Sequence, residues 1–285
     1  MKIVQSLVEM QDISRQLRRS GARIGLVPTM GALHEGHLSL VRSAKSQCSH
    51  VVTSIFVNPL QFGPNEDFTR YPRTFEADSE LLEHEHVEVL FAPSAAEMCR
   101  PGAETFVEVP DIGARLDGAS RPGHFRGVTT IVSKLFHIVR PNLSFFGQKD
   151  AAQVAVLRRM IRDLNFQVQL CVCPTVREPD GLAMSSRNRY LTAQERDSAL
   201  ALSRALQAAE ARSSCTSDAV ELRQVLLEGL RRSQGVRIDY AALVDPDTLE
   251  ETTTVSQGAL LAVAAWVGST RLIDNLLLAP RRIPS

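Results

Sequence analysis

Residues 24–37 read IGLVPTMGALHEGH, and this stretch decides the fold. Its apolar beginning, residues 24–27, is bounded by Gly and Pro and predicts a buried parallel strand. From about Gly36 the apolar spacing predicts a helix, so a strand, a glycine-containing turn and a helix follow one another. His34 and His37 are three residues apart and share one face of that helix. A strand that leads into a helix N-terminus is typical of nucleotide-binding α/β folds.

The two histidines are expected beside free backbone N–H groups at the start of the helix. There the helix dipole favours phosphate and disfavours additional positive charge on imidazole, so both rings could donate hydrogen bonds to phosphate oxygens. A zinc signature of the form H-E-x-x-H is disfavoured, because the second His comes one residue too early and Gly interrupts the helix start. Two solvent-exposed histidines remain an alternative when this segment is taken alone.

Strand-like and helix-like segments alternate through the first 175 residues, which predicts an α/β fold. We expect a Rossmann-like parallel sheet with helices on both faces, in which ligands bind outside the carboxyl ends of the strands. The predicted strands are residues 24–27, 50–57, 87–91, 143–146 and 166–173. The predicted helices between them include residues 75–85, 127–139 and 150–164.

The chain becomes richer in helix after about residue 176, which predicts a smaller α+β cap domain at the C-terminus. Thr192 and Glu195 form a capping-box pattern at the start of a helix. The predicted helices are residues 194–212 and 217–232, and the predicted strands are residues 238–244, 260–267 and 271–274. We therefore expect two domains, residues 1–175 as the Rossmann-like domain and residues 176–285 as the cap.

The composition limits the classes of partner. The 285 residues include 32 basic and 32 acidic side chains, so the net charge predicts no binding to nucleic acid or to anionic membranes. The N-terminus lacks a signal-peptide pattern, and no apolar run approaches the roughly 20 residues of a membrane helix. A cytoplasmic protein with small-molecule ligands is expected. The five scattered cysteines are expected to be reduced.

Polar side chains follow several of the predicted strands. Asn58 and Gln61 can present amides to a hydroxyl or carboxylate ligand, although for Asn58 taken alone simple turn chemistry is the better explanation. Lys149 lies at the mouth of a helix, with Gln153 one turn further on, and can neutralise a phosphate. Residues 184–187, MSSR, combine two hydroxyls with a guanidinium, as an anion site requires. Each of these segments alone is also compatible with an ordinary solvated loop.

Seven motifs occur together in the order found in one enzyme family. The chain closely resembles the bacterial pantothenate synthetases, and the match is collinear over nearly its whole length. Residues 34–37 and 184–187 resemble the two ATP signatures of the class I aminoacyl-tRNA synthetase and nucleotidyltransferase superfamily. The seven motifs are residues 28–37, 57–62, 71–74, 121–128, 145–150, 184–191 and 271–275.

The resemblance implies an activity. The family condenses (R)-pantoate with β-alanine, using ATP and Mg²⁺, to give pantothenate, AMP and pyrophosphate through a pantoyl adenylate, in the biosynthesis of pantothenate (vitamin B5) and coenzyme A. It also implies a homodimer in which residues 1–175 bind ATP and pantoate. One alternative is an adenylyltransferase that acts on a phosphate-bearing acceptor. Another is a nucleotide-binding regulatory module without turnover, which the full set of phosphate-binding residues disfavours.

The resemblance also assigns roles to individual residues. The catalytic contacts to the phosphates are expected from His34, His37, Lys149 and Arg187. Further contacts to ATP are expected from Met30, Gly31, Gly147, Asp150, Val176, Met184, Ser185 and Ser186. Pantoate and β-alanine are expected to contact Gln61, Gln153 and Asn58. Asp78 is expected to assist a Mg²⁺ ion that is held mainly by phosphate oxygens and water.

Overall fold

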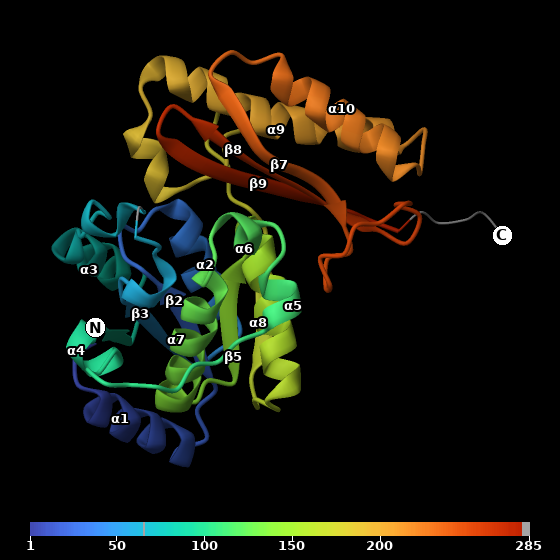
Figure 1. Ribbon diagram of the computed structural model, residues 1–285. Coiled ribbons are helices and arrows are strands. Elements are labelled where there is room, and N and C mark those ends of the chain that lie inside the picture. The colour runs from blue at the N-terminus through green and yellow to red at the C-terminus, as the bar shows by residue number, and fades with distance from the viewer. Residues whose placement is uncertain (65, 281–285) are drawn as a thin grey trace.

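Two β-sheets form the framework of the computed structural model, which describes residues 1–64 and 66–280 (Figure 1). The first sheet has six parallel strands in the order β1-β4-β3-β2-β5-β6. The second has three antiparallel strands in the order β7-β8-β9. The strands of the first sheet are β1 (Lys2–Val4), β2 (Ile24–Thr29), β3 (His50–Ile55), β4 (Val89–Phe91), β5 (Leu143–Gly147) and β6 (Gln169–Cys173).

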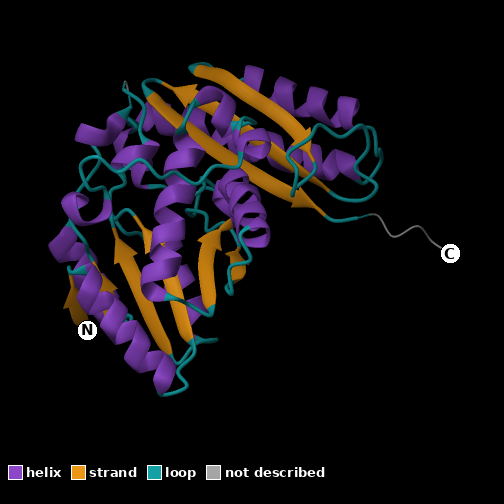
Figure 2. Ribbon diagram, turned by 60° about the horizontal axis from the view of Figure 1, so that its bottom comes forward, coloured by secondary structure: helices purple, strands orange, loops and turns teal. Residues whose placement is uncertain are grey.

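Helices cover both faces of the first sheet, as the sequence predicts (Figure 2). Adjacent residues of a strand point to opposite faces. Leu26 accordingly packs in the apolar cluster that includes α1, α7 and α8, whereas Val27 packs with α2 and α3 on the other side. The helices of this half are α1 (Leu7–Arg19), α2 (Glu35–Lys45), α3 (Phe75–His84), α4 (Ala95–Met98), α5 (Pro110–Gly113), α6 (Asp117–Ser120), α7 (His124–Val139) and α8 (Ala151–Asp163).

The strand order reverses between β2 and β5. From β2 the chain continues outward to β3 and β4, whereas from β5 it continues to β6 on the opposite side. Strand β2 pairs with β3 along residues 24–29 but with β5 only at Gly25 and Leu26. The ladder on the β5 side thus ends before Pro28, which has no N–H to contribute. A crevice at the carboxyl ends of β2 and β5 is the expected ligand position in such a sheet.

The second sheet lies between the first half of the chain and two long helices (Figure 1). Leu260 and Ala262 of its middle strand join the large apolar cluster of the first half, whereas Leu261 and Val263 pack with the helices. The middle strand is therefore buried on both faces. The strands are β7 (Val236–Val244), β8 (Ala259–Val267) and β9 (Thr270–Leu278), and the helices are α9 (Ala193–Ser213) and α10 (Ala219–Arg231).

The predicted fold class is confirmed, and the differences are local. Strand β9 is longer than the predicted 271–274, because its pairing with β8 continues to Leu278. Helix α1 and strand β1 have no counterpart among the predictions, since β1 has three residues and α1 fully buries only Met10 and Ser14. The division at residues 175 and 176 stays a prediction. No helix within residues 1–64 and 66–280 is long and apolar enough to span a membrane.

Candidate active site

The turn after β2 is held in a strained conformation by a buried carboxylate. Gly31 and Ala32 have φ values of 80° and 51°, so two successive backbone N–H groups form a concavity that suits an anion. Asp78 of α3 occupies it and accepts hydrogen bonds from the N–H groups of Ala32 and Leu33, both at 2.8 Å. Its side chain is 2% exposed. Asp78 therefore positions the turn that precedes the histidines, and its expected assistance to a Mg²⁺ ion stays a prediction.

This role of Asp78 leads to a prediction. Asp78→Ala is expected to lower the free energy of unfolding by about 3 kcal/mol, because two backbone N–H groups lose a charged acceptor. Asp78→Asn should lose less, since its amide oxygen still accepts one of these bonds. Urea unfolding measures both, and the Mg²⁺ concentration for half-maximal activity should stay unchanged in Asp78→Asn. If Asp78→Asn had normal stability but needed a much higher Mg²⁺ concentration for activity, Asp78 would instead act as a magnesium ligand.

The two histidines form the beginning of α2. His34 is the N-cap residue, His37 is in the first turn, and the ring centroids are 4.1 Å apart. The backbone N–H of His34 donates to Nδ1 of His37 (3.4 Å), so the proton of a neutral His37 ring is on Nε2. Burial, together with the positive charge of Lys149, lowers the pKa of His34 to about 4. Burial, His34 and Lys149 lower the pKa of His37 to about 3. Both imidazoles are therefore neutral hydrogen-bond donors at pH 7.

Two features of the histidine pair indicate a ligand site. Nδ1 of His34 is buried and has no hydrogen-bond partner within the part of the chain that the structure describes. Buried polar atoms are nearly always paired, so an unpaired one often marks a ligand or water position. Gly36 allows a close approach here: a Cβ atom at this residue would lie 2.9 Å from the His34 ring and 3.7 Å from Cβ of Met184. The loop of the second half thus lies against the start of α2.

The predicted serine–arginine loop is anchored on both sides. The N–H of Met184 donates to the carbonyl of Val176 (2.9 Å), which brings together two of the residues predicted to contact ATP. Oγ of Ser185 accepts a hydrogen bond from the N–H of Arg187 (3.2 Å). Oγ of Ser186 lies 3.4 Å from the hydroxyl of Tyr71. Both serine hydroxyls therefore lie in a loop connected to both halves of the chain.

A cavity of about 860 Å³ lies between the two halves. Its walls include five of the predicted site residues: Lys149, Asp150, Gln153, Ser185 and Arg187. The other predicted residues are not part of its lining: Met30, Gly31, His34, His37, Asn58, Gln61, Asp78, Gly147, Val176, Met184 and Ser186. The histidines nevertheless lie near this cavity. Lys149 of its wall is close enough for its positive charge to lower the pKa of both rings.

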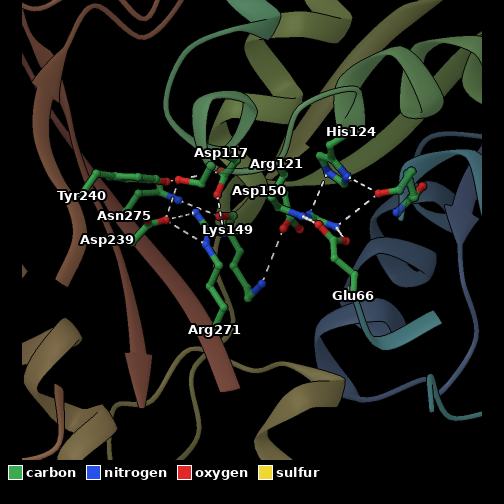
Figure 3. A network of polar contacts seen from close by, with 12 residues as sticks. Glu66, Asp117, Arg121, His124, Lys149, Asp150, Asp239, Tyr240, Arg271 and Asn275 are labelled. Atoms are coloured by element: carbon green, nitrogen blue, oxygen red, sulfur yellow. Dashed lines mark hydrogen bonds and ion pairs between the residues drawn. The ribbon is translucent and has the colours of Figure 1, made fainter. Parts of the chain in front are cut away.

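Two arginines of the cavity are paired with carboxylates that the sequence did not reveal. Nε and Nη2 of Arg187 donate to Asp67, both at 2.9 Å. Arg121 forms the same type of two-point contact with Glu66, at 2.8 and 2.5 Å (Figure 3). Burial would raise the pKa of Asp67, but the hydrogen bonds and charge of Arg187 outweigh this and lower it. Both acids lie on the segment between β3 and α3.

The two predicted amides of the loop after β3 differ in their surroundings. Asn58 is 2% exposed, and its side chain bonds to the backbone of Leu60 and Gly127 and to Oε1 of Gln61. It therefore supports the loop, and its expected contact with substrate stays a prediction. Nε2 of Gln61 faces the sulfur of Met30 at 3.1 Å. A thioether is a weak acceptor, so this amide is available for a carboxylate.

The buried histidines make stability depend on pH. The pKa of His124, like that of His34, is about 4, because burial and then the charge of Arg121 lower it. In the unfolded chain the histidines have pKa values near 6.5 and bind protons below that pH. In the folded protein the same histidines stay unprotonated until the pH is much lower. The stabilisation is complete above about pH 6.5 and is lost as the pH falls toward 4.

We therefore expect the free energy of unfolding to decrease between pH 7 and 5. In His124→Asn this decrease should be smaller, by up to about 1.4 kcal/mol per pH unit, because one buried histidine is removed. Asparagine preserves a donor for the carbonyl of Gln61, which His124 contacts at 2.8 Å. Urea unfolding at several pH values measures the slope, and identical slopes in the variant and the original chain would refute this assignment.

Comparisons with known proteins reveal extensive similarity. A family model described as pantoate-beta-alanine ligase matches residues 2–277. The pantothenate synthetase of Koribacter versatilis is 55% identical over 98% of this chain and 96% of its own length. That of Thermotoga neapolitana is 54% identical over 98% of this chain and 100% of its own length.

Solved structures agree with this similarity. Pantothenate synthetase from Thermus thermophilus has a TM-score of 0.93 and 44% identity, over 98% of this chain and 100% of that one. Pantoate-beta-alanine ligase from Francisella tularensis, complexed with beta-gamma ATP and beta-alanine, has a TM-score of 0.79 and 34% identity. That comparison covers 97% of both chains.

Proposed function

Because this chain belongs to the pantoate–β-alanine ligase family, we propose on that basis how its residues act in the reaction. The protein is an ATP-dependent ligase that joins pantoate to β-alanine to form pantothenate. The observation that supports the assignment of residues best is the position of two neutral imidazoles and Lys149 where the strand order reverses between β2 and β5. Such a position combines a helix N-terminus with hydrogen-bond donors for phosphate.

In the first step a carboxylate oxygen of pantoate attacks the α-phosphorus of ATP, and pyrophosphate leaves. The enzyme must align two anions and stabilise the charge that develops on the phosphate oxygens. His37 donates from Nε2, His34 assists it, and Lys149 supplies a positive charge. The hydroxyls of Ser185 and Ser186 bind the departing phosphates.

Arg187 completes this phosphate site from an anchored position. Asp67 accepts hydrogen bonds from Nε and Nη2, so the N–H groups of Nη1 would be the ones that contact the phosphates. The ion pair with Asp67 reduces the rotamer freedom of the long side chain before ATP binds, which lowers the entropic cost of ordering it. The remaining contacts to the nucleotide come from Met30, Gly31, Gly147, Asp150, Val176 and Met184.

Gln61 and Gln153 bind pantoate. Gln61 is suited to this because its backbone carbonyl is fixed by Arg121 and His124. Within residues 1–64 and 66–280, its side-chain amide bonds only to the sulfur of Met30 and to Asn58. Gln153 lies in the first turn of α8 and lines the same cavity as Lys149. The two amides can therefore approach one small carboxylate and its hydroxyls from different elements.

Magnesium fits this site as an ion carried by ATP. The described residues contain no group of three His, Cys, Asp or Glu side chains that could hold a metal ion. Three arginines of the cavity, Arg121, Arg187 and Arg271, are neutralised by the carboxylates of Glu66, Asp67, Asp117 and Asp239. Mg²⁺ would therefore be bound by phosphate oxygens and water, where it neutralises charge on the triphosphate. Asp150, whose side chain is 47% exposed beside Lys149, is the carboxylate placed to contact its hydration shell.

In the second step the amine of β-alanine attacks the acyl carbon of the adenylate, and AMP leaves with the carboxylate oxygen that attacked phosphorus. The acyl phosphate would hydrolyse in open water, so enclosure between the two halves protects it. The complex of the Francisella tularensis ligase with beta-gamma ATP and beta-alanine supports binding of both substrates in a protein of this fold.

Product analysis tests the reaction directly. The purified protein is incubated with ATP, Mg²⁺ and D-pantoate, with and without β-alanine, and the products are followed by mass spectrometry. Pantothenate, AMP and pyrophosphate should accumulate only when β-alanine is present. Transfer of AMP to a phosphate ester without consumption of β-alanine would instead identify an adenylyltransferase, and ATP binding without turnover would identify a regulatory module.

The family resemblance supports three further features. We propose a homodimer, a cytoplasmic location and a boundary near residue 175 between the ATP-binding and cap domains. Light scattering tests the first, since a homodimer has twice the 31.4 kDa mass of the chain. A scattering mass equal to that of one chain, over the concentration range used for activity, would contradict the dimer.

A further inference from the structure

Asn275 of β9 holds the backbone of the loop that carries Lys149. Its side-chain amide donates to the carbonyl oxygens of Gln148 (2.9 Å) and Lys149 (2.8 Å). Its Oδ1 accepts a hydrogen bond from Nε2 of Gln148 (3.0 Å). Asn275 is 5% exposed, so these contacts are shielded from water. Figure 3 shows Asn275 beside Lys149, next to the strands of the second sheet.

Asn275 is itself fixed by a buried ion pair. Its backbone N–H donates to Oδ1 of Asp274 (2.8 Å), and Arg177 donates to both carboxylate oxygens of Asp274 at 2.7 and 3.0 Å. Asp274 is 3% exposed. Arg177 directly follows Val176, so this chain of contacts connects the loop of Lys149 with the loop that leads to Ser185.

The geometry has a direct consequence for Lys149. A lysine is a point charge on a flexible stem, so its usefulness depends on where its backbone lies. Residues 148–150 form a single 3₁₀ turn between β5 and α8. So short a turn has few hydrogen bonds of its own to restrain its backbone. The Asn275 amide binds the carbonyl oxygens of both Gln148 and Lys149, and this fixes the orientation of the turn. The Lys149 side chain lines the cavity in this orientation. Among side chains of this size, only an amide donates twice and accepts at the same end.

We propose that Asn275 is a positioning residue that acts through Lys149, so that the second sheet orients the phosphate-binding lysine. The proposal rests on the role of Lys149 proposed above. A displacement of about 1 Å in a reacting group can cost as much as 10²-fold in rate. Removing Asn275 leaves Lys149 in place with a less restricted backbone, so Asn275→Ala should lower the rate of adenylate formation by about 10-fold.

A double-mutant cycle tests this in single-turnover reactions with ATP, Mg²⁺ and pantoate. The variants are Asn275→Ala, Lys149→Ala and the double variant. If Asn275 acts through Lys149, adding Asn275→Ala to Lys149→Ala should change the rate by less than about twofold. An equal loss in both backgrounds, or a normal rate in Asn275→Ala alone, would overturn the proposal. Normal activity of Lys149→Ala would instead refute the proposed role of that lysine.

Asp247→Asn is the matched control. Asp247 pairs with Arg158 of α8 at 2.7 Å and thus also joins the second half to α8, but it is exposed and remote from residues 148 and 149. The rate of adenylate formation in Asp247→Asn should stay within about twofold of the rate of the unsubstituted protein. Should Asn275→Ala not fold, Gln148→Ala answers the same question, because it removes the donor that orients the Asn275 amide. Gln148→Ala should lower the rate of adenylate formation less than Asn275→Ala does, and it should have no effect in the Lys149→Ala background. An equal loss of rate in the Lys149→Ala background would overturn the proposal.

Discussion

Replacing Lys149 with alanine is expected to lower the rate of adenylate formation by about 10²-fold or more. The lysine side chain is 20% exposed at the cavity wall, and its only ion pair among the described residues is with Asp150 at 3.5 Å. Three arginines of the cavity, Arg121, Arg187 and Arg271, are tied to acids at shorter distances, so Lys149 is more available to the triphosphate than these arginines. Its removal deprives the transition state of a positioned charge in a partly buried site.

Rapid quenching of a single turnover, with pyrophosphate as the readout, measures this loss. Lys45→Ala is the control, since Lys45 pairs with Glu88 away from the cavity and its removal should not affect the rate. A rate in Lys149→Ala within about threefold of the original would contradict the assignment, because the scale for such a partner is about 10²-fold.

Replacing His37 with alanine is expected to have an effect of similar size, about 10²-fold. The reason differs, because a ring with a pKa of about 3 acts as a neutral N–H donor and not as a cation. His37→Gln, which can direct an amide N–H toward the Nε2 position, should recover part of the loss. Since the wild-type ring stays neutral, its protonation should not shape the rate profile between pH 5 and 8.

The same single-turnover assay, repeated across this pH range, checks the prediction. His50→Ala is a suitable control, because His50 lies at the beginning of β3, at the opposite end from the crevice. Wild-type rates in His37→Ala would refute the role, and a wild-type rate that rises steeply below pH 6 would indicate that the charged imidazolium is the active form.

Local sequence is sufficient for the framework of the site. The strand, turn and helix of residues 24–37 are encoded by adjacent residues, and the structure has β2 followed by α2 with His34 at its N-cap. The rule that ligands bind at the carboxyl ends of parallel strands then selects Gln61 and Lys149 from many similar residues. The pattern of adjacent residues is therefore enough to predict this part of the fold.

Long-range pairings cannot be predicted in the same way. Arg187 and Asp67 are 120 residues apart, and Asn275 and Lys149 are 126 apart, so nothing in either neighbourhood indicates the partner. The family resemblance suggests that Asp78 assists a Mg²⁺ ion, because its position matches an acidic one in the family. Only the structure reveals that two backbone N–H groups already occupy its carboxylate.

Transfer of an isotopic label tests the central claim, that the carboxylate of pantoate attacks the α-phosphorus of ATP in this crevice. Pantoate carrying oxygen-18 in both carboxylate oxygens is converted to pantothenate, and the released AMP and pyrophosphate are analysed by mass spectrometry. The account predicts one labelled oxygen in each AMP and none in pyrophosphate. Unlabelled AMP, or label in pyrophosphate or phosphate, would contradict it.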